Sequence, residues 1–327
     1  SLDLTTPAFG PPRTSGGMLR DCVGQKQHLG GEHLASLTAL RRLRLAGAEP
    51  HLSEQQALAA WQHLEELRLL QLPQYFRVQQ RLGEAGFWPV LPRLVNLTLL
   101  EAHEVAGPPS KVLGTSLPTR LASLLMRPPS LEHTFTGPAL PPLAPALTAL
   151  ELSAGRELRA LPMSPSLRRL AVICREPLPQ WPEGTSAMVQ LTGLYLSCPL
   201  EEFPAPLTSL PAVEVLQTGG TGLIDLPQQL AFVGSLRQLA MRGPYNHLSR
   251  VPAVLGGGAA SRLEHLDLRE NYDLVVDDEG LAVLQSLTAL TYLSLLRARQ
   301  GVKPDDAGTE VLRRALEAPR KRDRHLL

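Results

Sequence analysis

The sequence predicts an α/β solenoid, with a curved sheet of parallel strands on one side and short helices, 3₁₀ turns and loops on the other. The main observation is the spelling Leu-x-x-Leu-x-Leu-x-x-Asn from Leu263 to Asn271, whose imperfect copies recur along most of the 327 residues. The last two leucines of such a unit point to one side of a short strand, and the residues beside them point to the other. One strand cannot bury its leucines alone, so stacked units share a continuous core in which each repeat contacts its neighbours.

The copies return at a nearly constant spacing. Successive units lie 20 to 30 residues apart, close to the spacing of about 20 to 29 residues that is typical of leucine-rich repeats. From about residue 34 to about residue 316 the chain therefore resembles the leucine-rich-repeat family, which implies a solenoid with its strands on the concave side. Only Asn271 matches the asparagine of the family's turn. The units begin at Leu40, Leu64, Leu94, Leu121, Leu147, Leu167, Leu191, Val213, Leu236, Leu263 and Leu290.

The segments that return from one strand to the next are of two kinds. Those in the middle carry a proline, which disrupts a helix interior, so we expect turns or 3₁₀ turns there, as in leucine-rich repeats of the Leu-Pro type. Residues 277–284 and 305–312 each open with two acidic residues, and Ser53 with Gln56 spells a capping box, which predicts helices of the ribonuclease-inhibitor type near the ends. The middle prolines follow Leu161, Trp181, Phe203, Leu226 and Val251.

Irregular segments flank and interrupt the repeats. Residues 1–33 are rich in proline and glycine without a sustained period, so we expect an irregular N-terminal arm. Residues 34–316 are expected to form the solenoid of about 11 or 12 repeats, and residues 317–327 a basic C-terminal tail. The proline-rich stretch from Arg127 to Pro145 contains either a decayed strand at Leu131 to Thr136 or a loop.

Composition and spacing argue against several classes of function. The chain has 32 Lys and Arg against 31 Asp and Glu, a formal net charge of +1, so nucleic acid is not expected as its main ligand. No apolar stretch reaches the about 18 residues of a membrane helix, and no membrane insertion is expected. The nine histidines are scattered without partners at metal-ligand spacing, so we expect no metal and no cofactor. We expect His265 and Asp267 to be an exposed polar pair on one strand, with Leu266 between them in the core.

Three cysteines bear on the cellular compartment. Secreted leucine-rich-repeat proteins generally carry disulfide-bonded caps, and no cysteine lies near the C-terminal end here, which favours an intracellular, cytoplasmic location. An organellar location after removal of an N-terminal segment stays open as an alternative. Cys174 and Cys198 each follow the first leucine of their unit by seven residues, so they share a register as two reduced core residues or as a disulfide.

The repeat also predicts which side chains are exposed. Residues two, four and six positions after each first leucine are expected to face the hollow side of the sheet. Charged residues dominate this face at the ends and apolar or small residues in the middle, and an exposed apolar stripe usually marks a protein contact. A register error of one residue would instead turn the stripe inward. We single out as partner-binding residues Arg68, Leu70, Leu100, Leu125, Arg169, Ile173, Tyr195, Val215, Arg242, Arg269 and Tyr292.

These observations predict a non-enzymatic scaffold that binds other proteins through its concave face, as a structural or accessory subunit of a larger assembly. A second interpretation is a regulatory adaptor of an enzyme, because leucine-rich repeats also serve in ubiquitin-ligase substrate receptors and phosphatase regulators. The sequence before residue 34 shows no F-box-like helical leader, which counts against the ligase version. A third interpretation, a receptor ectodomain, is opposed by the missing cysteine caps.

Overall fold

The chain is described by a computed structural model, which covers residues 2–5, 38–46, 60–70, 91–103, 117–127, 146–154, 164–174, 177, 181, 185–200, 202–243 and 246–295. It divides into two compact units. The first unit comprises Ser1–His133 and Pro141–Leu147, and the second comprises Thr134–Leu140 and Thr148–Leu327.

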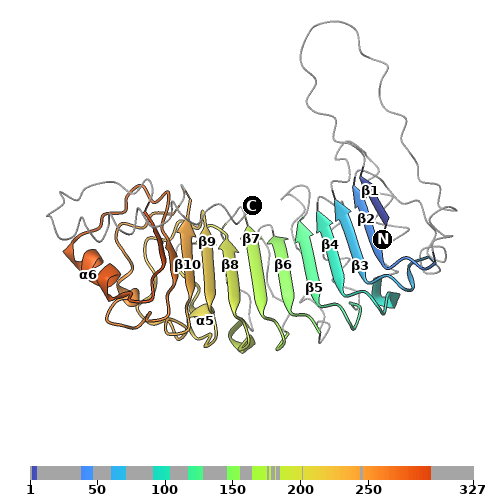
Figure 1. Cartoon of the computed structure of the whole chain (residues 1–327), viewed down its shortest axis with the longest axis horizontal. Helices are drawn as coiled ribbons and strands as arrows, with labels where there is room; N and C mark the ends of the chain where they lie inside the picture. The colour runs from blue at the N-terminus through green and yellow to red at the C-terminus, as the bar shows by residue number, and fades with distance from the viewer. Residues whose placement is uncertain are drawn as a thin grey trace, which may run out of the picture. The chain divides into compact units, whose positions relative to one another are not determined.

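The first unit is a ladder of parallel strands in sequence order. Each strand pairs with the next one along the chain, so that Arg42 lies opposite Glu66 and Leu43 lies opposite Leu67. Figure 1 shows these strands side by side, from dark blue to blue-green. The strands are β1 (Leu2–Thr5), β2 (Arg42–Ala46), β3 (Glu66–Leu70), β4 (Leu99–His103) and β5 (Ser123–Arg127), and a 3₁₀ helix, η1 (Leu91–Arg93), precedes β4.

The second unit repeats this arrangement over seven strands, all parallel and each paired with its sequence neighbours within the unit (Figure 1). The predicted parallel-strand solenoid with a leucine-rich core is therefore confirmed. The strands are β6 (Ala149–Ala154), β7 (Arg169–Cys174), β8 (Gly193–Ser197), β9 (Val215–Gly219), β10 (Gln238–Arg242), β11 (His265–Asp267) and β12 (Tyr292–Ser294).

Two backbone contacts recur from repeat to repeat and hold the register. A tight turn precedes the first leucine, whose N–H donates to the carbonyl three residues earlier, as from Leu191 to Met188 and from Leu263 to Ala260. The carbonyl just after each first leucine then accepts two N–H groups from the next repeat; Arg237 O, for example, accepts from Glu264 and His265. Because these bonds satisfy the backbone between the strands, the first leucines and the strand leucines can be buried together.

The predicted register is wrong in one repeat. The repeat that contains β4 starts at Leu97 rather than at Leu94. The backbone N–H groups of Thr98 and Leu99 donate to Glu65 O, and the N–H of Leu97 donates to Leu94 O. Leu94 therefore occupies the turn that precedes the repeat. Leu100, which we expected on the exposed face, is 0% exposed and packs in the core opposite Leu67. Both registers spell an acceptable leucine pattern, and the hydrogen bonds to the preceding repeat decide between them.

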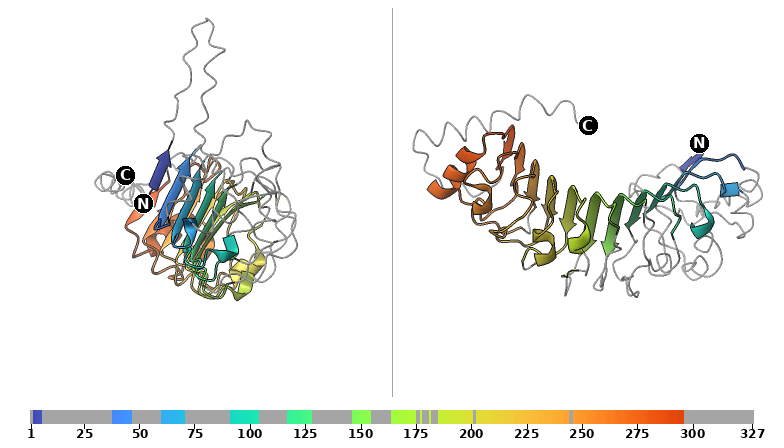
Figure 2. Two further views of the ribbon diagram at one scale, coloured as in Figure 1. Left: turned by 90° about the vertical axis from the view of Figure 1, so that its right-hand side faces the viewer. Right: turned by 90° about the horizontal axis from the view of Figure 1, so that it is seen from below.

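The returning segments of the second unit agree with the proline rule. Pro204 precedes a single helical turn, α5 (Ala205–Thr208), and Pro252 caps the 3₁₀ helix η3 (Ala253–Leu255), while η2 (Thr185–Ala187) follows Pro182. In the right-hand view of Figure 2, η2 and α5 lie below the row of strands, on one side of the sheet. The repeats that contain η2, α5 and η3 are 24, 22 and 27 residues long, and single helical turns suit such short returns.

The acidic signal at residue 277 correctly predicted a helix. Helix α6 (Asp278–Ser286) begins after Asp277, whose carboxylate accepts a hydrogen bond of 2.8 Å from the N–H of Gly280, and Asp278 and Glu279 occupy its first turn. Carboxylates at this end favour the helix dipole. The helices predicted over 305–312 and after Ser53 lie outside the described residues, apart from Ala60 and Trp61, which are helical.

The N-terminal segment differs from the prediction of a wholly irregular arm. Residues 2–5 form β1, which pairs in parallel with β2 and places Leu2 opposite Leu43 and Thr5 opposite Ala46. Leu-Asp-Leu-Thr has the two-residue alternation of a strand, but four residues are too few to stand out as a repeat. The rest of the predicted arm, the segment 128–145 and the C-terminal tail lie outside the described residues.

Candidate binding surface

The strands present one row of side chains to solvent and bury the next. In β8, Leu194 and Leu196 are buried while Tyr195 between them is half-buried, and β9 shows the same alternation. We call the solvent side of the strands the sheet face, defined by the residues two, four and six positions after each first leucine. The structure places on it the predicted residues Arg68, Leu125, Arg169, Ile173, Tyr195, Val215, Arg242, Arg269 and Tyr292.

Two of the predicted residues, Leu70 and Leu100, are not among those that the structure places on the sheet face. Leu100 is not on the sheet face, because the repeat begins three residues later than expected; Leu99 and Glu101 take the face positions of β4 instead. The strand register places Leu70 opposite Ala46, but its side chain lies outside what the structure describes. The register is decided by the hydrogen bonds from Thr98 and Leu99 to Glu65 O, which join two repeats and give no signal in the local sequence.

The centre of the sheet face in the second unit is apolar and consists of half-buried side chains with small neighbours. Ile173, Tyr195 and Val215 are half-buried on β7, β8 and β9. Their neighbours are small: a Cβ added to Gly219 would lie 3.6 Å from the Tyr195 hydroxyl, so the tyrosine ring extends across β9 where that strand has no side chain. We call Ile173, Tyr195 and Val215, with Gly219, the central patch.

A charged cluster lies further along the same face, over β10 and β11. The carboxylate of Asp267 is 0% exposed and is held by two arginines. Arg242 Nε lies 2.8 Å from Asp267 Oδ2, while Arg269 donates through Nε (3.0 Å to Oδ1) and Nη2 (2.9 Å to Oδ2). The predicted exposed pair of His265 and Asp267 is therefore wrong for Asp267, because the two arginine side chains cover it.

His265 makes a different contact from the one the sequence suggested. Its ring stacks on Tyr292 of β12, with ring centroids 4.0 Å apart and an angle of 4° between the planes. Burial lowers the pKa of His265, and Arg242 and Arg269 lower it further, while Asp267 acts in the opposite direction. The imidazole is therefore neutral near pH 7 and adds no charge to the sheet face.

Two arginine–glutamate ion pairs lie on the sheet face of the first unit. Arg42 Nε lies 3.2 Å from Glu66 Oε1, and Arg68 Nη1 lies 3.4 Å from Glu101 Oε2. Leu99 and Leu125 are half-buried beside these pairs. Exposed ion pairs of this kind contribute little stability, and each leaves no net charge.

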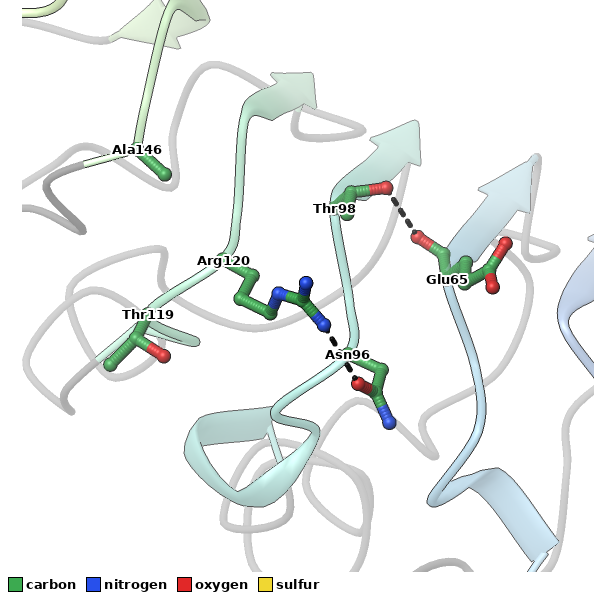
Figure 3. Close-up of a pocket in the computed structure, with 6 residues that line it drawn as sticks. All are labelled: Glu65, Asn96, Thr98, Thr119, Arg120 and Ala146. Carbon is green, nitrogen blue, oxygen red and sulfur yellow. Dashed lines mark hydrogen bonds between the residues drawn. The ribbon is translucent and has the colours of Figure 1, made fainter.

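The first unit also contains an open hollow of about 360 Å³ near the N-terminal ends of its strands (Figure 3). Arg120 donates to Asn96 Oδ1 (3.2 Å), and the hydroxyl of Thr98 donates to Glu65 O (3.0 Å). These polar groups bond to one another, so the hollow offers few free donors or acceptors aimed into it. It is lined by Glu65, Asn96, Thr98, Thr119, Arg120 and Ala146.

Within the described part of the chain, no three His, Cys, Asp or Glu side chains lie together as a metal site would require. Nor is any described helix long and apolar enough to cross a membrane. Cys174 and Cys198 are buried free thiols, and Cys198 Sγ lies 3.5 Å from Val172 O. Of the two alternatives for this pair, the structure has the reduced core residues.

No family model matches the sequence, and no curated protein is similar enough to count as a relative. Solved structures with a similar fold include a leucine-rich-repeat protein of Leptospira interrogans (19% identity, TM-score 0.49), which covers 87% of this chain; the chain spans 61% of that protein. An internalin, InlF, of Listeria monocytogenes matches at 17% identity and a TM-score of 0.46, over 86% of each chain.

A third similar structure is the leucine-rich-repeat ectodomain of the plant membrane receptor kinase GASSHO1/SCHENGEN3 of Arabidopsis thaliana. Its identity is 16% and its TM-score 0.39, over 83% of this chain and 37% of that one. The leucine-rich-repeat fold of this chain rests on its own strand register, repeated turns and buried leucines.

Proposed function

We propose that this chain is a non-enzymatic scaffold that binds other proteins through its sheet face. The observation that carries the proposal is the central patch: Ile173, Tyr195 and Val215 remain partly exposed on a face that the solenoid does not need for its own core. Apolar and aromatic side chains that lie among small residues on a solvent face are typical of the centre of a protein interface.

The residues that most resembled an enzyme site support a binding role instead. His265 stacks on Tyr292, and Asp267 is bonded to two arginines, so these two residues do not form the His–Asp pair of a catalytic relay. Both contacts fix side chains on rigid strands. A preordered surface loses little conformational entropy when a partner binds.

Within this proposal the chain is a structural or accessory subunit of a larger assembly, in an intracellular compartment. Within each unit, the paired strands hold the sheet face in one conformation before any partner binds, which suits a lasting contact. The two buried free thiols, Cys174 and Cys198, suit a reducing compartment, where disulfides are rare.

The test replaces Ile173 and Tyr195 together by Asp in the full chain. The double variant is expected to keep the circular dichroism and melting temperature of the parent, because both side chains point to solvent, and to lose the proteins that co-purify with the parent from its native source. Val189→Asp is the matched control. Val189 is 52% exposed but lies in the turn before β8, outside the sheet face, so this variant should keep its partners.

Two outcomes would contradict the proposal. Unfolding of the double variant would mean that Ile173 and Tyr195 belong to the core. An unchanged set of co-purifying proteins in a folded double variant would mean that binding takes place elsewhere on the chain.

A further inference from the structure

The second unit holds an unequal charge cluster on its sheet face, formed by Arg242, Asp267 and Arg269. In the pairs Arg42–Glu66 and Arg68–Glu101 each arginine contacts one glutamate, whereas here two guanidinium groups share one carboxylate. The cluster therefore carries one surplus positive charge. Arg242 and Arg269 are 46% and 36% exposed, while Asp267 is fully buried beneath them.

The hydrogen bonds to Asp267 leave much of both guanidinium groups available. A guanidinium group has five N–H donors in a planar fork. Arg242 contacts Asp267 through Nε, and Arg269 through Nε and Nη2. Neither terminal nitrogen of Arg242, nor Nη1 of Arg269, has a hydrogen bond to the described part of the chain. The buried carboxylate thus orients both arginines without saturating them.

Two titratable neighbours of this cluster are Glu270, whose negative charge acts on the Arg269 guanidinium, and His265. His265 is the residue next to Arg242 and Arg269 that could change its charge near neutral pH, and its lowered pKa keeps it neutral there. The ring of His265, two residues before Asp267 on β11, stacks on the ring of Tyr292 of β12. Gly219 of β9 lies opposite Arg242, and the Tyr195 hydroxyl of the central patch lies over it.

We infer that Arg242 and Arg269 form a binding site for an acidic side chain, an Asp or Glu carboxylate, of a partner protein that lies along the sheet face. A carboxylate would neutralise the surplus charge and accept two parallel N–H bonds from a fork that is already oriented. This inference rests on the proposed function, because the acidic residue would belong to the same partner that covers the central patch.

A protein carboxylate fits the site better than a nucleic-acid backbone does. Protein surfaces that bind nucleic acid carry rows of positively charged side chains that follow successive phosphates. Here the two arginines stand beside the uncharged central patch, and the chain as a whole has a formal net charge of only +1. One acidic residue within an otherwise apolar contact segment matches this layout.

The test measures binding of the full-length chain to a fluorescent peptide of consecutive glutamates, by fluorescence polarisation at low ionic strength. A glutamine peptide and a single-stranded oligothymidylate serve as comparison probes. We expect the glutamate peptide to bind best, and Arg242→Gln to weaken it by about tenfold or more, as for the loss of a charge-assisted hydrogen bond. Arg242→Lys, which keeps the charge but loses the fork, should fall between the two.

Arg168→Gln is the matched control, because Arg168 is an exposed arginine of the same unit that lies just before β7, outside the sheet-face positions. It removes the same charge away from the cluster and should change the affinity by less than about twofold. Melting temperatures of all variants are recorded, so that affinities are compared among folded proteins only. Arg269→Gln provides a second variant of the site should Arg242→Gln fail to fold.

Each remaining outcome overturns the inference. Equal weakening by Arg242→Gln and Arg168→Gln would mean diffuse attraction to the charge of the whole unit. A lower melting temperature with unchanged affinity would mean that the arginines only hold Asp267. Tighter binding of oligothymidylate that depends on Arg242 would mean a phosphate site. A parent chain that does not bind the glutamate peptide, but loses its partners on the Ile173 and Tyr195 substitutions, would remove this inference and leave the proposed function intact.

Discussion

Oδ1 of Asn246 accepts hydrogen bonds from both the backbone N–H and the hydroxyl of Thr221, at 2.8 and 2.7 Å, across 25 positions of sequence. Its Nδ2 donates to Arg242 O at 2.9 Å and to Thr218 O at 3.4 Å. Asn271 has a similar role one repeat later, where Nδ2 donates to Met241 O and Leu268 O. Buried asparagines thus tie successive turns together at two places, although only Asn271 matched the sequence pattern.

We predict that Asn246→Ala lowers the free energy of unfolding by about 1 to 3 kcal/mol, because it leaves buried backbone and hydroxyl groups without partners. Urea unfolding followed by circular dichroism measures the change. Gln238→Ala, at an exposed polar position of β10, is the control and should stay within about 0.5 kcal/mol of the parent. Equal stability of the two variants would show that the asparagine bonds do not hold the turns.

The register of β4 can be tested with two adjacent leucines. Leu100 is fully buried, whereas Leu99 is half-buried on the sheet face. Leu100→Ala should therefore cost about 2 to 5 kcal/mol of stability, and Leu99→Ala less than about half as much, since only the first leaves a cavity in the core. Thermal unfolding of both variants provides the comparison. The reverse order of melting temperatures would restore the register that starts at Leu94.

The leucine pattern alone predicted most of the fold, because burial of one strand face is a property of the local sequence. It failed at Leu100 because two overlapping spellings, from Leu94 and from Leu97, satisfy the same pattern. The choice between them depends on hydrogen bonds from Thr98 and Leu99 to Glu65, which belongs to the preceding repeat. Such a contact spans 33 or 34 residues, and no local spacing reveals it.

The sheet face was predicted less completely than the core. The alternation of strand residues placed Ile173, Tyr195 and Val215 correctly on it. It could not show that Asp267 is buried, since a position on the solvent side of a strand does not reveal what the neighbouring side chains cover. Asn246 was missed because it follows its first leucine, Leu236, by ten residues, whereas Asn271 follows Leu263 by eight.

The two buried thiols should be unreactive in the folded chain. Cys174 and Cys198 are 5% and 0% exposed, and the hydrogen bond with Cys174, together with burial, raises the pKa of the Cys198 thiol. Since the thiolate is the reactive form, we expect iodoacetamide to modify neither residue until denaturant is added. Mass spectrometry of the labelled peptides measures this. Rapid modification of Cys198 in native conditions would contradict its burial.

The pH dependence of stability should include a contribution from His265. Burial first, and then Arg242 and Arg269, lower the pKa of His265 in the folded chain below its ordinary value of about 6.5, against the opposite effect of Asp267. Between these two pKa values the unfolded chain binds more protons than the folded chain, so stability rises with pH in that window. This contribution is present above about pH 6.5 and is lost as the pH falls through the folded pKa.

His265→Gln removes the titrating ring, so the melting temperature of this variant should fall less than that of the parent when the pH is lowered from about 7.5 to about 5. His63→Gln controls for the loss of one exposed imidazole in the first unit and should follow the parent. The comparison uses the change in melting temperature with pH, because the loss of the stack on Tyr292 lowers the His265→Gln curve at every pH. A steeper acid loss in His265→Gln than in the parent would mean that Asp267 outweighs burial and that the folded chain holds the proton more tightly.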